Sequence, residues 1–168
     1  MAINPFKYLL IFVVSVLLQV LIFNNILIAR VIAPFVYILF IVLLPFETPR
    51  SLLMVLALIL GFTVDLFTNT PGVHASACVL IGFLRPVILN LITSRETLES
   101  VSNPRVSNMG FHWFATYVAF LVVTHHLFLF FIEAFTFDSF LLTILRVILS
   151  SVMSIVLIVL SQFLIFRN

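Results

Sequence analysis

Charged residues are scarce in this chain. Eight lysines and arginines and six aspartates and glutamates make up 8% of its 168 residues, whereas soluble domains contain about 25% charged residues. Hydrophobic residues make up 64% of the chain, and the mean hydropathy is +1.35. A soluble domain of this size leaves much of its surface in water and cannot bury so many apolar side chains. The composition therefore excludes a water-soluble fold and predicts an integral membrane protein, with the lipid bilayer as its solvent.

The features of several kinds of functional site are also missing. A single cysteine, Cys78, excludes an intrachain disulfide and a cysteine cluster for a metal. The basic residues are scattered, so nucleic acid is not an expected partner. The sequence has no glycine-rich phosphate loop and no nucleophile elbow. We therefore expect neither an enzyme nor a cofactor.

The apolar runs predict about six transmembrane helices in a single all-α domain. A spanning helix needs about 20 mostly apolar residues. The runs are continuous rather than alternating, which favours helices over a β-barrel. Turn-forming residues separate the runs, and one sizeable polar loop covers 93–108. The expected spans are 6–24, 31–44, 51–67, 73–92, 111–132 and 140–166, of which the second is short.

The distribution of charge predicts the orientation in the membrane. With six spans, the charged residues of the loops and termini fall into two sets, one on each side of the membrane. The first set is Lys7, Arg50, Arg95, Arg105 and Arg167, and the second is Arg30, Glu133 and Asp138. Loops rich in lysine and arginine stay in the cytoplasm, so both termini are expected there.

Three charged residues, Asp65, Arg85 and Arg146, fall inside the expected spans. Charges at such positions are costly and by default indicate function. Asp65 and Arg146 fall at similar depths, so we predict an ion pair between them, with His74 as a second candidate partner of Asp65. The pair either fixes the helix registry or forms an outward-facing ligand or proton site. Arg85, followed by Pro86, either makes a contact deep in the membrane or reaches toward the cytoplasmic phosphates.

Other polar groups in the spans have a structural interpretation. The side chains of His125 and His126 point about 100° apart on a helix, and no further ligand follows four residues away, so no metal site is expected. Ser150, Ser151 and Ser154 are expected to stabilise helix contacts rather than act as nucleophiles.

Residues 61–86 predict a tightly packed helical hairpin. Gly61 lies one helical turn before Asp65 and permits close approach of another helix. Gly72 follows Pro71 in a short turn. The hairpin would carry polar groups at its outer tip and Arg85-Pro86 near its inner end.

This hairpin carries a family resemblance. The segment G-F-T-V-D-L-F-T-N-T-P-G-V-H-A-S-A-C-V-L-I-G-F-L-R-P resembles the rod shape-determining MreD family. The resemblance covers most of the first 92 residues; beyond them only the general hydropathy agrees. Within the hairpin it is carried by Gly61, Asp65, Gly72, Ala75 and Ala77, with an Arg85-Pro86 pair typical of one branch. Earlier matching positions are Gln19-Val20-Leu21, Asn24, Ala33-Pro34, Tyr37 and Pro45.

The resemblance implies a fold similar to the six-helix substrate-binding subunits of energy-coupling-factor vitamin transporters. It also implies a non-catalytic role in the bacterial cell-elongation complex, which directs lateral peptidoglycan synthesis and sets rod shape. The implied partner is MreC, within a larger complex that includes MreB, RodA and a penicillin-binding transpeptidase. The implied location is the cytoplasmic membrane.

Two hypotheses about function stay open. A scaffold that binds other membrane proteins predicts a lipid-exposed groove with small residues. A small-molecule-binding subunit of a transporter predicts a pocket rich in Asn, Trp, Tyr and charge near the outer face. The residues expected near that face are Asp65, Asn69, His74 and Glu133, whereas Trp113 is expected near the cytoplasmic end.

Overall fold

Five long helices dominate the structure, a computed structural model that describes residues 5–25, 31–135 and 140–165. All five are long and apolar enough to cross a membrane, and the described ranges contain no strand. The chain therefore has the architecture of an all-helical, multi-pass membrane protein. The long helices are α1 (Pro5–Leu21, followed by the 3₁₀ helix η1, Phe23–Asn25), α3 (Arg50–Thr68), α4 (Val73–Ile92), α7 (Phe111–Ala134) and α8 (Phe140–Ile165).

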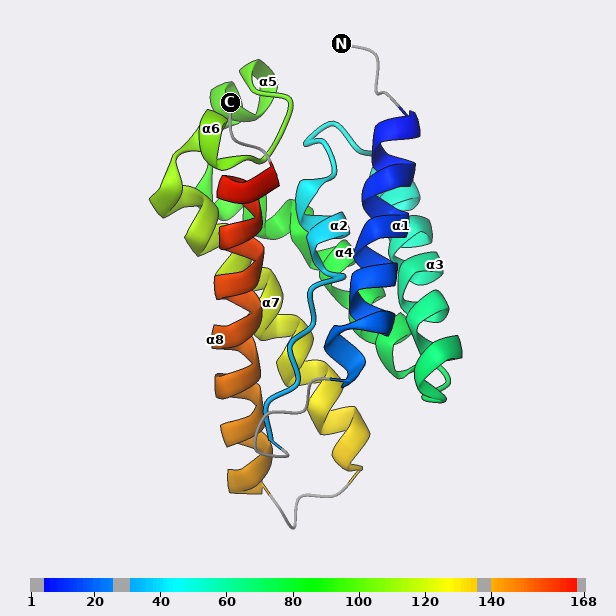
Figure 1. The fold of residues 1–168 in the computed structure, drawn as a ribbon. Coiled ribbons are helices and arrows are strands. Elements are labelled where there is room, and N and C mark those ends of the chain that lie inside the picture. Colours follow the sequence, from blue (N-terminus) through cyan, green and yellow to red (C-terminus); the bar gives the residue numbers. More distant parts are fainter. Residues whose placement is uncertain (1–4, 26–30, 136–139, 166–168) are drawn as a thin grey trace.

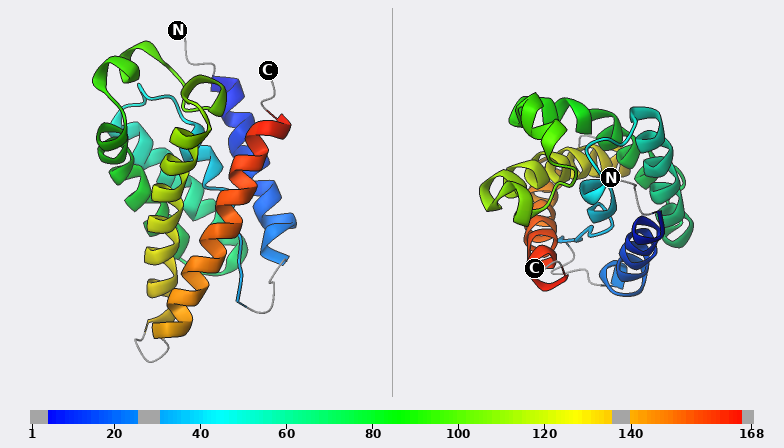
Figure 2. Two further views of the ribbon diagram at one scale, coloured as in Figure 1. Left: turned by 90° about the vertical axis from the view of Figure 1, so that its left-hand side faces the viewer. Right: turned by 90° about the horizontal axis from the view of Figure 1, so that it is seen from above.

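The long helices form an open ring (Figures 1 and 2). Around the ring α1 packs on α3, α3 on α4, α4 on α7 and α7 on α8. The open side lies between α1 and α8, and the short helix α2 (Leu39–Leu43) lies inside the ring, as the view from above shows (Figure 2). All five residues of α2 are buried, so it forms the centre of the hydrophobic core.

One end of the ring carries most of the described basic residues. The start of α1, the end of α8 and two short helices, α5 (Arg95–Ser100) and α6 (Val106–Met109), lie at this end (Figure 1). Lys7, Arg50, Arg95 and Arg105 lie at or next to the helix starts there, and we call it the basic end. The α3–α4 turn lies at the opposite, far end (Figure 1). Three of the charged residues that predict the orientation lie outside the described ranges: Arg30, Asp138 and Arg167.

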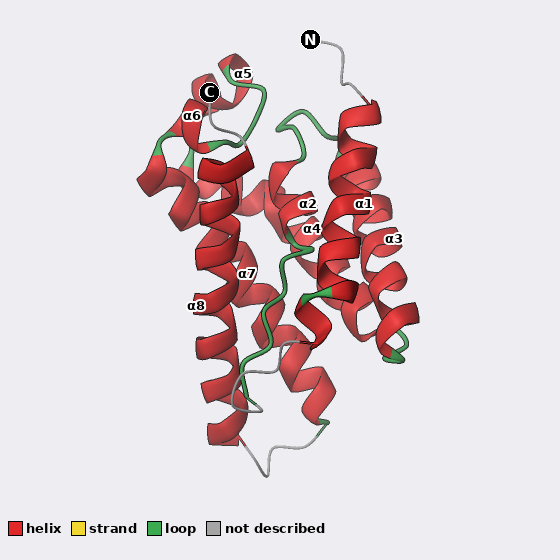
Figure 3. Ribbon diagram, in the orientation of Figure 1, coloured by secondary structure: helices red, strands yellow, loops and turns green. Residues whose placement is uncertain are grey.

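The expected second span, 31–44, is not a transmembrane helix. The chain has no helix at 33–36, turns at 37–38 and then forms α2. The non-helical part passes through the ring between α1 and α8 (Figure 3). The run is shorter than the ~20 residues of a spanning helix, and Pro34 disfavours a helical conformation at Ala33. In place of the six expected helices, the described ranges therefore contain five long helices and one mostly non-helical crossing.

Gln19 of α1 satisfies part of the backbone in this crossing. Its side-chain oxygen accepts hydrogen bonds from the backbone N–H groups of Val36, at 2.7 Å, and Tyr37, at 3.4 Å. Its amide nitrogen donates to the carbonyl of Pro34 at 3.2 Å. Gln19 is fully buried. A backbone without helical hydrogen bonds is tolerated at membrane depth only where other groups bind it, and Gln19 supplies such groups.

Two serines of α8 bind the same crossing from the other side of the opening. The Ser150 hydroxyl accepts a hydrogen bond from the N–H of Ala33 at 3.1 Å, and the Ser154 hydroxyl accepts one from the N–H of Phe35 at 2.8 Å. The crossing is therefore attached to both α1 and α8, which do not pack along each other as the other neighbouring helices do.

Gly61 lets the backbones of α3 and α4 touch. A Cβ atom at this position would lie 2.5 Å from the Cα of Ala75 and 2.5 Å from the carbonyl oxygen of His74. Both atoms belong to the backbone and cannot move aside as a side chain would. Gly72, at the end of the following turn, has a φ of +86°, which favours glycine.

Substitution of Gly61 is expected to separate the two helices. Gly61→Ala should destabilise the protein by about 3 kcal/mol, the upper part of the usual range for overpacking, because the new methyl group meets backbone. Gly82→Ala is the comparison, since the nearest atom to its Cβ would be the side-chain Cβ of Ala57, at 3.1 Å, and backbone atoms would lie no closer than 3.5 Å. The melting temperature in detergent should fall clearly further for Gly61→Ala. An equal fall for both would contradict the backbone contact.

The serines of α8 provide a test of the crossing. Ser154→Ala leaves the buried N–H of Phe35 without an acceptor and also removes the contact of the hydroxyl with Nε2 of His126, so it should cost at least about 1–3 kcal/mol. Ser151→Ala is the matched control, because the Ser151 hydroxyl is buried on the same helix and forms no hydrogen bond with any described residue. Thermal melting in detergent should show a loss for Ser154→Ala and no loss for Ser151→Ala. Equal melting temperatures would refute the proposed role of Ser154.

Candidate functional site

The Asp65 carboxylate closes the turn between α3 and α4. Its Oδ1 accepts hydrogen bonds from the Thr70 hydroxyl, at 3.0 Å, and the His74 N–H, at 2.9 Å. Its Oδ2 accepts from the N–H groups of Gly72 and Ala75, both at 3.0 Å. These N–H groups lie at the start of α4, which has no intrahelical acceptors for them, and a negative charge is stabilised at this end of a helix. Asp65 is therefore a buried capping residue of α4.

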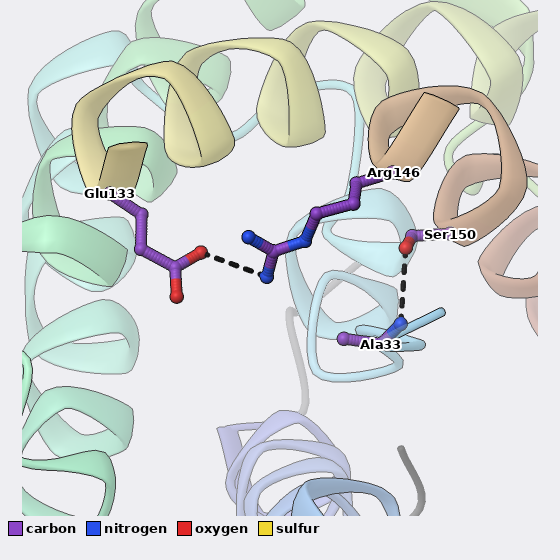
Figure 4. A network of polar contacts seen from close by, with 4 residues as sticks. All are labelled: Ala33, Glu133, Arg146 and Ser150. Carbon is purple, nitrogen blue, oxygen red and sulfur yellow. Dashed lines mark hydrogen bonds and ion pairs between the residues drawn. The ribbon is translucent and has the colours of Figure 1, made fainter. Parts of the chain in front are cut away.

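The predicted ion pair between Asp65 and Arg146 is wrong. Arg146 pairs with Glu133 at 3.3 Å, and Figure 4 shows their side chains extending toward each other from α8 and α7. The Arg146 guanidinium also lies over the Phe130 ring, 4.6 Å from its centroid. The physical reason is that the turn already supplies Asp65 with four donors. His74 contacts Asp65 through its backbone N–H and not through its ring.

The ring of His74 instead belongs to a buried cluster around Tyr37. The Tyr37 hydroxyl lies 2.8 Å from Nδ1 of His74 and 2.8 Å from Nε2 of His125. A hydroxyl has one proton, so Tyr37 donates to one imidazole and accepts from the other. Nδ1 of His125 is buried and has no hydrogen-bond partner within the described part of the chain. Three polar rings from α4, α7 and the crossing are thus joined through one hydroxyl.

His125 and His126 have separate partners, as their angular separation on α7 predicts. Nδ1 of His126 contacts the carbonyl of Val122 at 2.8 Å, and its Nε2 lies 3.2 Å from the Ser154 hydroxyl. Among residues 5–25, 31–135 and 140–165 no three His, Cys, Asp or Glu side chains gather as metal ligands. The histidines therefore fix α7 against the crossing and α8.

A cavity of about 520 Å³ opens at the far end of the ring. Its volume falls within the range of small-molecule sites. His74 lines this cavity and also joins the Tyr37 cluster, so the cavity has a polar connection to the interior. The other polar residues of its lining are Asn24, Asn25, Thr68, Thr70, Glu133 and Arg146.

Arg85 caps the end of the buried helix α2. Its guanidinium donates to the carbonyls of Leu44 and of Pro45, the latter at 3.3 Å, and to the Tyr117 hydroxyl at 2.6 Å. Tyr117 in turn donates to the carbonyl of Val42 at 3.2 Å. The last carbonyls of a helix lack intrahelical donors and carry partial negative charge. Arg85 is only 1% exposed, so its side chain does not extend out to the membrane surface and is held by protein groups instead. Its position is immediately before Pro86, inside α4.

Three residues of this polar interior were not identified from the sequence as site residues. Gln19 and Tyr37 were noted only as parts of the family resemblance, and Tyr117 was not noted. Each is a hydrogen-bonding side chain within a largely apolar segment. That signal could have been used, since a polar group buried in a membrane needs a partner.

The separation of Asp65 from Arg146 predicts additive effects. Asp65→Ala should destabilise the protein by at least about 3 kcal/mol, because several hydrogen bonds to a charged group are lost. Arg146→Ala should cost only about 0–1 kcal/mol, because its ion pair is partly exposed. Melting of the double variant in detergent should show the sum of the two losses within about 0.5 kcal/mol.

The control is a second double-mutant cycle, on the ion pair that Glu133 forms with Arg146. Glu133→Ala combined with Arg146→Ala should cost less than the sum of the single changes. A non-additive Asp65/Arg146 cycle with an additive Glu133/Arg146 cycle would contradict the arrangement.

Comparisons of the chain with protein families, with curated proteins and with solved structures find no match. The resemblance to the MreD family therefore stays a prediction from the residues that carry it.

Proposed function

We propose that this chain is a non-catalytic component of the bacterial cell-elongation complex, of the MreD type. It lies in the cytoplasmic membrane with both termini in the cytoplasm, binds MreC and helps to organise lateral peptidoglycan synthesis. MreB, RodA and a penicillin-binding transpeptidase belong to the larger complex.

The observation that carries the proposal is how the interior polar groups are used. Gln19, Ser150 and Ser154 bind the backbone of the crossing, while Asp65 and Arg85 cap the ends of helices. These side chains stabilise the architecture and leave the apolar outer faces for contact with lipid or with other membrane proteins. An assembly function needs a defined surface of this kind and no reacting groups.

A groove on the outer face of α3 and α4 adds support. It has a volume of about 530 Å³, and its lining includes three small residues, Gly72, Ala75 and Ser76. Met54, Leu58, Val79, Leu80 and Phe83 complete its lining. Small residues let transmembrane helices approach closely. The spanning helix of MreC is the proposed occupant, because helix association within a bilayer depends on such close packing.

Purification from native membranes in mild detergent, followed by mass spectrometry, tests the proposal. MreC and cell-wall synthases should be recovered in near-stoichiometric amounts. Ser76→Phe fills the groove and should lower recovery of MreC about tenfold or more, since loss of ~1.4 kcal/mol of packing is a tenfold change in affinity. Val156→Phe, on the exposed face of α8, is the matched control and should not change recovery.

A transporter subunit is the second candidate. The far-end cavity supports it, because amides, hydroxyls, His74 and one ion pair surround a volume that suits a small polar molecule. Recovery of an ATPase module or of a bound vitamin-sized molecule, without cell-wall proteins, would replace the scaffold proposal by this one. Trp113 does not contribute to that cavity and instead stacks on Tyr117 near the basic end.

A further inference from the structure

A second cavity, of about 600 Å³, lies at the basic end. The loop after α2, the second half of α4 and the short helix α5 enclose it. Three arginines, Arg50, Arg85 and Arg95, contribute to its lining. We propose that this cavity binds the phosphate of an anionic phospholipid headgroup.

The buried charge of Arg85 is the first reason. All of its hydrogen bonds go to neutral oxygens, those of two carbonyls and one hydroxyl. In the described ranges no carboxylate lies within salt-bridge distance of it. A buried charge without a counter-charge is costly. An anion in the cavity that Arg85 lines would stabilise it without breaking the cap of α2.

Arg50 and Arg95 give the cavity two accessible guanidinium groups. Arg50 lies over the Phe83 ring, 3.9 Å from its centroid, and donates one hydrogen bond of 3.3 Å to the Phe83 carbonyl. This contact fixes its position while leaving further N–H groups for a ligand. Arg95 is exposed and forms no ion pair with a described residue. Arginine binds phosphate oxygens through paired, parallel hydrogen bonds, and the exposed Asn90 amide is an additional donor in the lining.

Two carboxylates lower the net positive charge of the lining and so determine which anion matches it. Glu47 and Glu99 are exposed members of the cavity wall. Three guanidinium groups against two carboxylates leave one net positive charge. A phosphodiester has one negative charge and matches this balance, whereas the second charge of free phosphate would be repelled by the carboxylates. The lining therefore favours a phospholipid over inorganic phosphate.

The position of the cavity agrees with a lipid ligand. It lies where α3 begins and α4 ends, which is the depth of the headgroups for helices of this length. Anionic lipids are a feature of the cytoplasmic leaflet, and basic pockets between helices on that side bind their headgroups. Lipid binding needs no partner protein. It can therefore be disproved while the assembly proposal stands, and the assembly proposal can be disproved while lipid binding stands.

Native mass spectrometry of the full chain in detergent can measure the binding. The protein is titrated with phosphatidylglycerol, with phosphatidylethanolamine as the lipid of equal phosphate but no net charge, and with inorganic phosphate. The native protein should retain phosphatidylglycerol in preference to the other two. Arg50→Gln with Arg95→Gln should weaken this binding by about tenfold for each arginine, the change expected for loss of a hydrogen bond to a charged group.

A matched variant controls for charge at the basic end. Lys7→Gln with Arg105→Gln removes two positive charges at the same end, from residues that do not line the cavity, and should leave phosphatidylglycerol binding unchanged. Melting of both double variants in detergent checks that they are folded. Equal retention of both lipids by the native protein, or equal weakening in both variants, would overturn the proposal. Displacement of phosphatidylglycerol by millimolar inorganic phosphate would overturn the lipid assignment.

Discussion

A stretch of backbone without helical hydrogen bonds runs through the middle of this protein, and its polar groups need partners where water is absent. The partners come from neighbouring helices: an amide from α1, two hydroxyls from α8 and a guanidinium from α4. The apolar core forms around this arrangement, since all of α2 and the preceding Tyr37 and Ile38 are buried. The need to satisfy a single irregular segment thus accounts for the positions of Gln19, Arg85, Ser150 and Ser154.

Buried charged side chains, like the buried backbone of the crossing, are bound by nearby polar groups. Asp65 is bound by N–H groups at a helix start and Arg85 by carbonyls at a helix end. Peptide groups at helix ends carry the opposite partial charge in each case. Asp65 therefore needs no partner of opposite charge across the bundle, whereas the hydrogen bonds of Arg85 fix its position without supplying a counter-charge. The ion pair seen among the described residues, Arg146 with Glu133, lies in a partly exposed position.

Composition and hydropathy were sufficient to predict the class of fold and the five long helices of the described ranges, because apolar runs of spanning length leave few alternatives. The crossing at 31–44 was predicted as a helix, since hydropathy reports burial and not backbone conformation. Counting residues along each helix placed Asp65 and Arg146 at similar depths in the membrane. Depth does not show which way a side chain points around the ring, so the ion pair between them was wrongly predicted. Gly61 was identified because close backbone contact leaves a signature in the residue itself.

The attachment of the crossing to α8 has a consequence for biosynthesis. Chains are made from the N-terminus, and the hydroxyls that bind Ala33 and Phe35 lie 117 and 119 residues further along the sequence. When residues 33–35 leave the ribosome, their final acceptors have not been synthesised. The irregular segment must therefore stay hydrated, or bound by the insertion machinery, until the last helix arrives. Insertion of α8 is the step that completes the interior, and a chain truncated before it would keep an unsatisfied crossing at membrane depth.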